Sequence, residues 1–539
     1  MQSYFQYRRV QHVVDQHIQS AKEKFVKPAL ESGEHSDEQQ SNEKSLLQAP
    51  LSCAEILDSG EVESGTPLTF VVTWDGSDDP CNPKNFSVAK KVCTTLIVSL
   101  IAFAVGASAA TDAAVLPQAA EYFHVSEVTE SLATGVYLMG YAFGAVLAAP
   151  FSEALGRNVI YGSTVLLFGL FVMAAGLSPN IGAQIVLRFL AGFFGSTPLV
   201  CAGGTIADLW NQMEKTWAFP LYSITCFGAP LVSPVMASYV SIGKLHSWRW
   251  AEWINAMLAF LALFCVIMFM PETYGPLILK WKAQEIRKVT GDERYKSELE
   301  LSHRTMGMRM KVALTRPFEM ATEPIIVLMA LYLTVLYIVL FTFLNGFTFI
   351  FDDVYHIGQG LTNVSFITIQ IGMLFPSFLI YPVYKITQRD IARVQAEGRQ
   401  DLDPEVRLWY GMFGGSIAVP VSLFWMAWTD YASVSIWSPL IAGALFGYGV
   451  LCIFITVYMY VIDSYEVYAA SALTLVTFMR YLVAGGMTIV GIPFYRNMGT
   501  HWTLTILACI SGLLVPLPFV FYFWGRKIRS YSKHAAVKK

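Results

Sequence analysis

Twelve apolar blocks, each about 20 residues long and almost free of charged side chains, constrain this chain more than any other feature. Six come first, a long hydrophilic connector follows, and six more come after it. A bilayer requires about 20 apolar residues for each helical crossing. In lipid only helices and closed barrels satisfy every backbone polar group, and blocks this long are helical. The blocks run over residues 92–111, 131–150, 158–177, 182–205, 217–240, 250–270, 325–350, 363–384, 407–428, 436–461, 468–490 and 502–523.

The blocks predict an all-α membrane protein with twelve transmembrane helices in two six-helix halves. We expect a cytoplasmic and largely disordered segment at 1–88, because residues 30–66 are rich in Ser, Glu, Gln and Gly. Residues 1–28 are compatible with a short amphipathic helix on the membrane surface. The remaining divisions are a six-helix bundle at 89–270, a cytoplasmic connector at 271–323, a second bundle at 324–524 and a cytoplasmic tail at 525–539.

Charge and cysteine usage exclude several classes of function. Only 14% of the residues are charged, and the net charge of −3 comes without a basic stripe, so no nucleic-acid partner is expected. The eight cysteines lack the spacing of a zinc site, and no nucleophile–base pair or cofactor loop can be assembled. We therefore expect no metal, no cofactor and no enzymatic activity.

The distribution of Lys and Arg predicts the orientation in the membrane. The connector contains ten of them, whereas the opposite side holds only Lys244, Arg249 and Arg496. Cytoplasmic loops carry the excess of positive charge. Both termini are therefore predicted to be cytoplasmic, in a multi-pass protein of the cell membrane.

A short internal repeat supports two related halves. Pro150 precedes Arg157 by seven residues, and Pro382 precedes Arg389 by the same interval. Asp208 and Asp463 then end the fourth and tenth blocks. Duplicated six-helix halves are typical of transporters that work by alternating access.

Three charges lie inside or at the end of apolar blocks, namely Asp112, Arg188 and Arg480. A charge at the centre of a span costs about 2.5–3.5 kcal/mol, so each should face a cavity or a partner. The alternative for either arginine is a packing role with bonds to backbone carbonyls. The alternative for Asp112 is contact with outer water.

Two further motifs have both a functional and a structural interpretation. Glu153, Gly156 and Arg157 follow the second block and can form a charge network with Asp208, or simply a solvated turn. In the fifth block, Gly228, Pro230 and Pro234 can kink a helix and allow close packing. A set of mid-span polar side chains can line a substrate cavity with Arg480 or serve only in packing: Tyr137, Tyr222, Asn345, Gln370 and Tyr458.

From about residue 71 to residue 534 the chain resembles the major facilitator superfamily, and within it the fungal drug:proton antiporters with twelve spans. Phe86 stands where that family usually has Trp. The resemblance rests on these pieces together: Val72-Thr73-Trp74-Asp75-Gly76, Asp78-Asp79-Pro80, Asn82-Pro83-Lys84-Asn85, Ser247-Trp248-Arg249-Trp250-Ala251-Glu252-Trp253, Pro271-Glu272-Thr273-Tyr274, Lys282-Ala283, Thr290-Gly291-Asp292, Arg316-Pro317-Phe318 and Glu323-Pro324.

The resemblance implies roles for the motifs described above. Glu153, Gly156 and Arg157 match the family's gating motif, with Asp208 as partner, although Glu replaces the commoner Asp. Arg188 matches an arginine used in proton transfer or in the response to substrate. The fifth-span residues match the antiporter motif, but Ser233 and Ala237 replace common glycines.

Of two other charged positions, one agrees with the family pattern and one does not. Arg480 fits the family's eleventh span. Asp112 departs from the family, which usually has a small neutral residue there, so it is expected to tune selectivity or to act as an extra proton site.

The sequence as a whole predicts a monomeric, proton-coupled exporter of small amphipathic drugs, toxins or secondary metabolites. The partners expected are protons, the substrate and the lipid bilayer. The alternatives are a proton-coupled transporter of a defined nutrient or polyamine and, from another class, a membrane sensor on a transporter scaffold. No phosphate-binding loop for ATP is present in the sequence.

Overall fold

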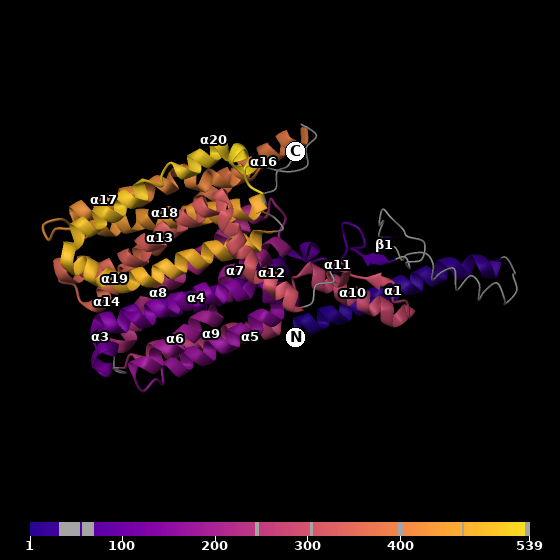
Figure 1. Cartoon of the computed structure of the whole chain (residues 1–539), viewed down its shortest axis with the longest axis horizontal. Helices are drawn as coiled ribbons and strands as arrows, with labels where there is room; N and C mark the ends of the chain where they lie inside the picture. The colour runs from indigo at the N-terminus through magenta and orange to yellow at the C-terminus, as the bar shows by residue number, and fades with distance from the viewer. Residues whose placement is uncertain are drawn as a thin grey trace.

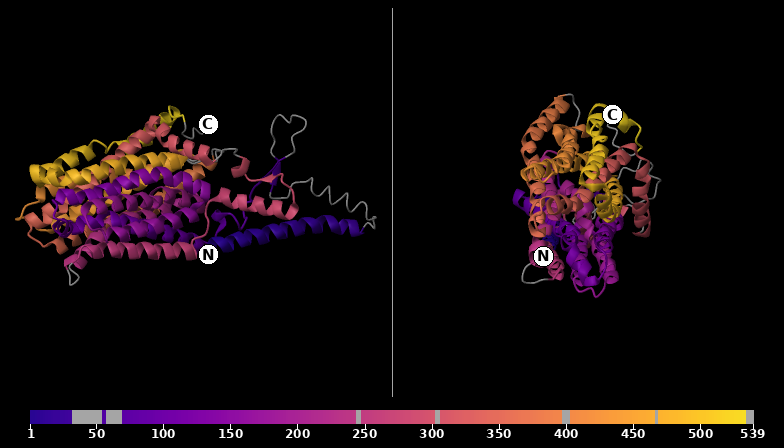
Figure 2. Two further views of the ribbon diagram at one scale, coloured as in Figure 1. Left: turned by 60° about the horizontal axis from the view of Figure 1, so that its bottom comes forward. Right: turned by 90° about the vertical axis from the view of Figure 1, so that its left-hand side faces the viewer.

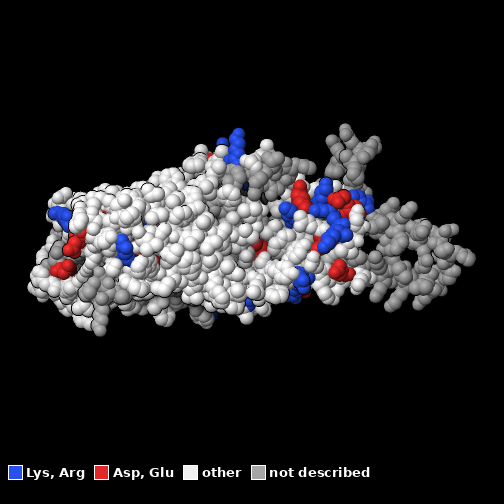
Figure 3. Space-filling model, turned by 90° about the horizontal axis from the view of Figure 1, so that it is seen from below, with Lys and Arg blue, Asp and Glu red and all other residues white. Residues whose placement is uncertain are grey.

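Long helices lie side by side along one axis of the molecule (Figure 1). The computed structural model describes residues 1–31, 54–56, 69–242, 247–301, 306–396, 403–465 and 468–533. We call the end of the helical bundle that carries α10 (Gly275–Thr290) the connector end and the opposite end the far end. A belt almost free of charge separates the charged side chains at the two ends (Figure 3), as a lipid-facing surface requires.

The first half of the bundle contains six apolar helical segments. The fourth of them is made of two consecutive helices that meet at Ser196. The segments are α3 (Val88–Phe123), α4 (Glu127–Leu155), α5 (Arg157–Ala175), α6 (Ile181–Gly195) with α7 (Thr197–Leu209), α8 (Lys215–Ile242) and α9 (Arg249–Phe269).

The second half is less regular, because several of its spans change helix type along their length. Its elements are α13 (Pro324–Phe347) with η3 (Thr348–Val354), α14 (Gln359–Val364) with α15 (Phe366–Leu374) and α16 (Pro376–Ala396), η4 (Pro404–Leu408) with η5 (Gly411–Gly415) and α17 (Ser416–Thr429), α18 (Trp437–Tyr465), α19 (Ala469–Gly512) and α20 (Leu517–Ser530).

Eleven helical segments among the described residues are long and apolar enough to cross a membrane. The last of them extends from Ala469 to Ser530, which is 62 residues. Gly499 breaks this segment with a left-handed φ of 76°. A break at this position divides the segment into two limbs of about 30 residues, each sufficient for a crossing. The all-α fold is confirmed, and the exact count of twelve stays a prediction.

Side-chain caps fix where several spans begin. Ser87, Ser126 and Asn180 precede α3, α4 and α6, and each side chain accepts a hydrogen bond from the backbone N–H three residues later. Such caps satisfy N–H groups that have no partner inside the helix. The residues that punctuate the apolar blocks therefore set the helix starts.

The N-terminal residues and the connector form one small unit at the connector end (Figure 2). In it, β2 pairs with β1 in the antiparallel sense and with β3 in the parallel sense, with Phe70 opposite Tyr295. The elements are α1 (Gln2–Glu31), β1 (Ala54–Ile56), β2 (Phe70–Val72), η1 (Pro83–Asn85), α10, β3 (Tyr295–Lys296), α11 (Glu298–Leu301), α12 (Met306–Glu319) and η2 (Met320–Thr322).

This unit differs from the largely disordered segment expected for residues 1–88. Val10 and Val14 of α1 are buried in one apolar cluster with Ile278 and Ile286 of α10. The side chain of Gln6 exchanges hydrogen bonds with the backbone of Glu272. The partners that order the segment lie more than 200 residues away, so its local composition does not reveal them. Most of the expected linker at 30–66 lies outside the described residues.

Helices of the two halves contact each other at both ends of the bundle. At the far end, Gln359 donates hydrogen bonds to the Ala114 carbonyl at 2.7 Å. At the connector end, Arg407 donates to Thr216 Oγ1 and to the Gln212 carbonyl, both at 2.9 Å. Between these ends α4 packs against α19. The halves are therefore in contact at the far end, at the connector end and in the middle of the bundle.

Candidate functional site

Two cavities open at opposite ends of the interface between the halves. The far-end cavity has a volume of about 720 Å³, and the connector-end cavity has about 530 Å³. The far-end cavity is lined by, among others, Ala114, Pro230, Pro234, Asp352, Ile492 and Arg496. The connector-end cavity is lined by, among others, Glu153, Arg157, Asp208, Lys215, Asp463 and Leu473. Both volumes lie in the range of small-molecule sites.

Aromatic side chains close the space between the two cavities. The ring of Tyr481 lies 5.1 Å from that of Tyr141 and 5.2 Å from that of Tyr337, measured between centroids. A void of only about 30 Å³ remains beside these three rings. That volume holds about one water molecule. A compound cannot pass from one cavity to the other in this arrangement.

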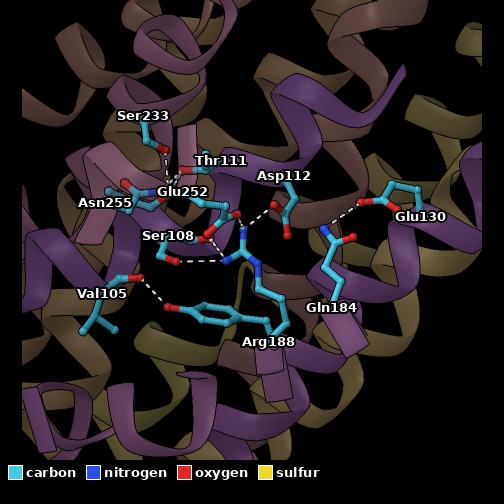
Figure 4. A network of polar contacts seen from close by, with 12 residues as sticks. Val105, Ser108, Thr111, Asp112, Glu130, Gln184, Arg188, Ser233, Glu252 and Asn255 are labelled. Atoms are coloured by element: carbon cyan, nitrogen blue, oxygen red, sulfur yellow. Dashed lines mark hydrogen bonds and ion pairs between the residues drawn. The ribbon is translucent and has the colours of Figure 1, made fainter. Parts of the chain in front are cut away.

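A buried charge cluster lies in the first half, centred on Arg188 of α6 (Figure 4). Arg188 is fully buried, and its Nη2 forms ion pairs with Asp112 of α3 and Glu252 of α9. Its Nη1 donates to the carbonyl and the hydroxyl of Ser108, both at 2.9 Å. One guanidinium thus connects three helices.

A third buried carboxyl group extends this cluster by one helical turn. Glu130 of α4 is 1% exposed and accepts a hydrogen bond of 3.0 Å from Gln184, which lies four residues before Arg188. The cluster therefore contains the carboxyls of Asp112, Glu130 and Glu252 around one guanidinium. Two ionised carboxylates on one arginine leave a net buried charge, which is costly in a low dielectric.

The cluster is also supported by neighbouring polar contacts. The guanidinium carbon of Arg188 lies 5.3 Å from the ring centroid of Tyr137, whose hydroxyl donates to the Val105 carbonyl at 2.9 Å. Asn255 donates to Thr111 Oγ1 at 2.7 Å. These bonds join α3 to α4 and α9. The charged cluster is therefore in contact with several helices at once.

Sequence reasoning singled out Arg188 and Asp112 but did not predict that they meet. Asp112 is 3% exposed, so the alternative in which it reaches outer water is wrong. Glu252 and Glu130 were missed as members of the site. Each lies near the start of a span, where an acidic residue is expected to be solvated. No local signal distinguishes these acids from ordinary helix-start residues.

The predicted gating residues gather at the connector-end cavity. Arg157 Nε lies 3.3 Å from an oxygen of Asp208, and both residues line the cavity. Glu153 lines the same cavity and is exposed, and the structure contains no ion pair between it and Arg157. The predicted network therefore contains its Arg–Asp pair without Glu153.

The carboxylate that binds the start of α5 belongs to Glu272, which follows the sixth span, and not to Glu153. The Glu272 carboxylate accepts hydrogen bonds from the backbone N–H groups of Arg157 and Asn158, at 3.0 and 3.1 Å, at the start of α5. It also accepts from the N–H groups of Thr273 and Tyr274. Burial raises the pKa of the Glu272 carboxyl, although these backbone donors oppose the shift.

Gly156 is required at this turn for two reasons. Its φ is +93°, a conformation that L side chains rarely adopt. In addition, a Cβ at this position would lie 2.6 Å from Glu272 Oε2. The glycine of the predicted gating motif therefore allows Glu272 to reach the start of α5.

The fifth-span motif lies where α8 meets both halves. Pro230 and Pro234 line the far-end cavity. Gly228 faces the second half, because a Cβ there would lie 2.8 Å from Gln370 Oε1. Ser233, which replaces a glycine of the family pattern, donates to the Ala107 carbonyl of α3 at 2.8 Å.

Most of the predicted cavity-lining residues are instead packed in the interior. None of Tyr137, Tyr222, Gln370, Tyr458 and Arg480 lines either large cavity. Tyr222 donates to the Pro198 carbonyl, and Tyr458 lies within hydrogen-bond distance of Thr477 Oγ1. Contact with a substrate stays a prediction for this set. Asn345 lies on α13, and its side chain is outside the described part of the structure.

The repeat seen in the sequence has only partial structural equivalence. Asp208 pairs with Arg157, which follows the second span. Asp463, at the corresponding place in the second half, pairs with Arg407 at 2.7 Å rather than with Arg389. The two acids are equivalent, whereas their arginine partners come from different places in each half.

Known proteins resemble this chain over most of its length. Residues 98–488 match the family model described as Major Facilitator Superfamily. The MFS-type transporter kojT of Aspergillus flavus is 44% identical over 469 residues, covering 87% of this chain and 83% of that protein. The major facilitator superfamily multidrug transporter FLU1 of Candida albicans is 32% identical, covering 88% and 77%.

A solved structure supports the fold independently of sequence. The proton:xylose symporter XylE bound to 6-bromo-6-deoxy-D-glucose aligns with a TM-score of 0.59 and 13% sequence identity. The alignment covers 81% of this chain and 97% of that chain. At this identity the similarity concerns the arrangement of the helices.

Proposed function

Since the chain belongs to the major facilitator superfamily and is a membrane transporter, we propose that it exports small amphipathic compounds in exchange for protons. The compounds are drugs, toxins or secondary metabolites, and the mechanism is alternating access. The observation that carries this proposal is the pairing of one buried arginine, Arg188, with two buried carboxyls, Asp112 and Glu252. Multidrug and efflux names among the relatives support the direction of transport.

Charge counting makes the cluster suitable for holding a proton. If Asp112 and Glu252 are both ionised, the pair and Arg188 carry a net charge of −1 in the interior. A proton on one carboxyl neutralises the group, because coupled carboxyls in one site share their protons. Gain and loss of this proton alter the ion pairs that join α3, α6 and α9, which gives a route from protonation to helix movement.

The two cavities support alternating access. They lie at opposite ends of one interface and are separated by the packed rings of Tyr141, Tyr337 and Tyr481. In our proposal, breaking the contacts of Arg407 opens the connector end, and breaking those of Gln359 opens the far end. We place the connector end in the cytoplasm, in accordance with the Lys and Arg distribution, and the plasma membrane is the membrane assumed in this proposal.

The proton gradient has enough free energy for this task. One proton moving down about 100 mV supplies about 2.3 kcal/mol. Two pH units add about 2.7 kcal/mol, since each is worth about 1.36 kcal/mol. About 5 kcal/mol sustains a gradient of a neutral substrate of several thousandfold.

The test uses the purified full chain in sealed vesicles with an imposed pH gradient. A panel of fluorescent amphipathic compounds of differing charge reports the flux. We expect flux driven by the gradient in the wild type and flux insensitive to it in Glu252→Gln, with normal behaviour in Glu121→Gln, an exposed control on α3. Wild-type flux that ignores both the gradient and an uncoupler contradicts proton coupling. Transport confined to one nutrient or polyamine contradicts the exporter.

A further inference from the structure

Arg480 of α19 is buried inside a cage of four aromatic rings. It is 1% exposed. The guanidinium carbon lies 4.7 to 5.5 Å from the four ring centroids. The rings belong to Tyr337 of α13, Phe454 and Tyr458 of α18, and Tyr481 of α19.

Arg480 differs from other buried arginines of the bundle in having no carboxylate partner among the described residues. Arg157, Arg188 and Arg407 each form an ion pair with at least one carboxylate. Across the described residues, no carboxylate lies within ion-pair distance of Arg480, and its Nε and Nη1 have no hydrogen-bond partner. Ring faces attract a cation but leave these N–H donors unsatisfied. An unsatisfied buried charge is costly and marks a functional position.

The cage lies between the two cavities. Leu473, seven residues before Arg480 on α19, lines the connector-end cavity, and Ile492, twelve residues after it, lines the far-end cavity. At 1.5 Å per residue these intervals are about 10 Å and 18 Å. Tyr337 and Tyr481 also line the small void between the cavities. A compound that crosses the protein along this interface must pass the cage.

We propose that Arg480 and its rings bind the anionic group of the transported compound, so that small planar organic acids are the preferred substrates. This proposal rests on the transport function proposed above and specifies its substrate class. A carboxylate accepts two parallel N–H bonds from a guanidinium, which satisfies the unpaired donors and balances the charge. The four rings provide flat apolar surface for the body of the acid. The void of about 30 Å³ is too small for such a compound, so binding requires one cavity to widen toward the cage.

The experiment measures binding by the purified full chain in detergent, where no proton gradient exists. The probes are benzoate, cinnamate and 2-naphthoate, each compared with its uncharged primary amide at pH 7, where the acids are ionised. We expect the wild type to bind at least one acid tenfold or more tightly than its amide. We expect Arg480→Gln to lose this preference and Arg480→Lys to retain part of it, because a lysine keeps the charge without the planar fork. Arg526→Gln, which removes an exposed charge on α20, should bind as the wild type does.

The outcomes separate the two proposals. Failure of wild-type vesicles to respond to a pH gradient contradicts proton coupling but leaves the acid preference standing. Binding of none of the three acids, or equal binding of acids and amides, overturns the acid site even if coupled transport is present. An Arg480→Gln protein that retains wild-type melting temperature and wild-type preference also overturns it. If that variant does not fold, the wild-type comparison of acids with amides and the Arg480→Lys data decide the question.

Discussion

Gly135 of α4 and Gly485 of α19 face each other so closely that neither position has room for a Cβ. A Cβ at Gly135 would lie 2.8 Å from the Gly485 carbonyl oxygen, and one at Gly485 would lie 2.6 Å from the Gly135 carbonyl oxygen. These helices belong to different halves of the bundle. The halves therefore touch backbone to backbone here, and in the alternating-access mechanism proposed above this contact separates during transport.

We expect Gly485→Ala to lower the transport rate at least tenfold, because the added methyl group prevents the halves from closing against each other. The measurement is flux in sealed vesicles containing equal amounts of protein. Gly486→Ala is the matched control, since no heavy atom lies within 4 Å of a Cβ there. Equal rates in the two variants contradict the role given to this contact.

Arg188→Gln should lower the free energy of unfolding by about 3–5 kcal/mol, because two buried carboxyls lose the cation that pairs with both of them. Thermal unfolding in detergent measures this. A triple variant that adds Asp112→Asn and Glu252→Gln should recover most of the stability, because the buried charge is removed, while transport remains lost. Failure of the triple variant to recover stability shows that Arg188 acts through something other than these two acids.

Glu272→Gln should lower the free energy of unfolding by about 1–2 kcal/mol, because an amide caps the start of α5 less well than a carboxylate. Faster hydrogen exchange at the Arg157 and Asn158 amides should accompany a lower melting temperature. Glu319→Gln, at an exposed site on α12, serves as the control. Unchanged exchange at both amides contradicts the capping role.

Asp79→Asn should loosen the segment at 69–86 from α10. Lys282 Nζ lies 3.3 Å from Asp79 Oδ2, and the Asp79 carboxylate also accepts from the backbone N–H groups of Asp75 and Cys81. Burial raises the pKa of the neighbouring Cys81 thiol to about 11, so in the wild type this cysteine should react slowly with a maleimide at pH 7.5. We expect alkylation to be at least tenfold faster in the variant, read by mass spectrometry.

The same aspartate predicts the sign of a pH effect. Burial alone would raise the pKa of Asp79, but the backbone donors and Lys282 hold it below its ordinary value of 3.8. A folded-state pKa below the unfolded one stabilises the protein at pH values above the unfolded pKa. This contribution is lost as the pH falls through the folded pKa. The melting temperature of the wild type should therefore fall more steeply below about pH 4 than that of Asp79→Asn.

The spans could be predicted from the sequence, because hydropathy is a local pattern, whereas the Arg157–Asp208 pair joins residues 51 apart and was expected only from the resemblance to the family's gating motif. Hydropathy over 20 residues marks a crossing wherever the helix later packs. The Arg188 cluster could be predicted only in part. Asp112, Arg188 and Glu252 are separated by 64 residues or more, and only the folded bundle brings them together. Glu252 lies in the first turn of α9, where an acid is ordinarily solvated.

Partners distant in sequence also explain why the aromatic cage was not predicted. Arg480 was expected to line a cavity or to bond backbone carbonyls, and the structure places it against rings from three helices. Periodicity shows which residues lie on the buried face of a helix. It does not show which helix faces that surface, so the lack of a carboxylate near Arg480 has no sequence signal.

The pairing of β2 with β3 has a consequence for how the first half moves. Phe70 lies opposite Tyr295, and Lys282 of α10 is ion-paired to Asp75 and Asp79, which precede α3. The segment before the first span is thus bound to the segment after the sixth span, so the two ends of the first half are held together. Because these contacts lie at the connector end, the first and sixth spans cannot separate there unless the contacts break. The strand pairing can form only after residue 296 has been synthesised, when all six helices of the first half are already present.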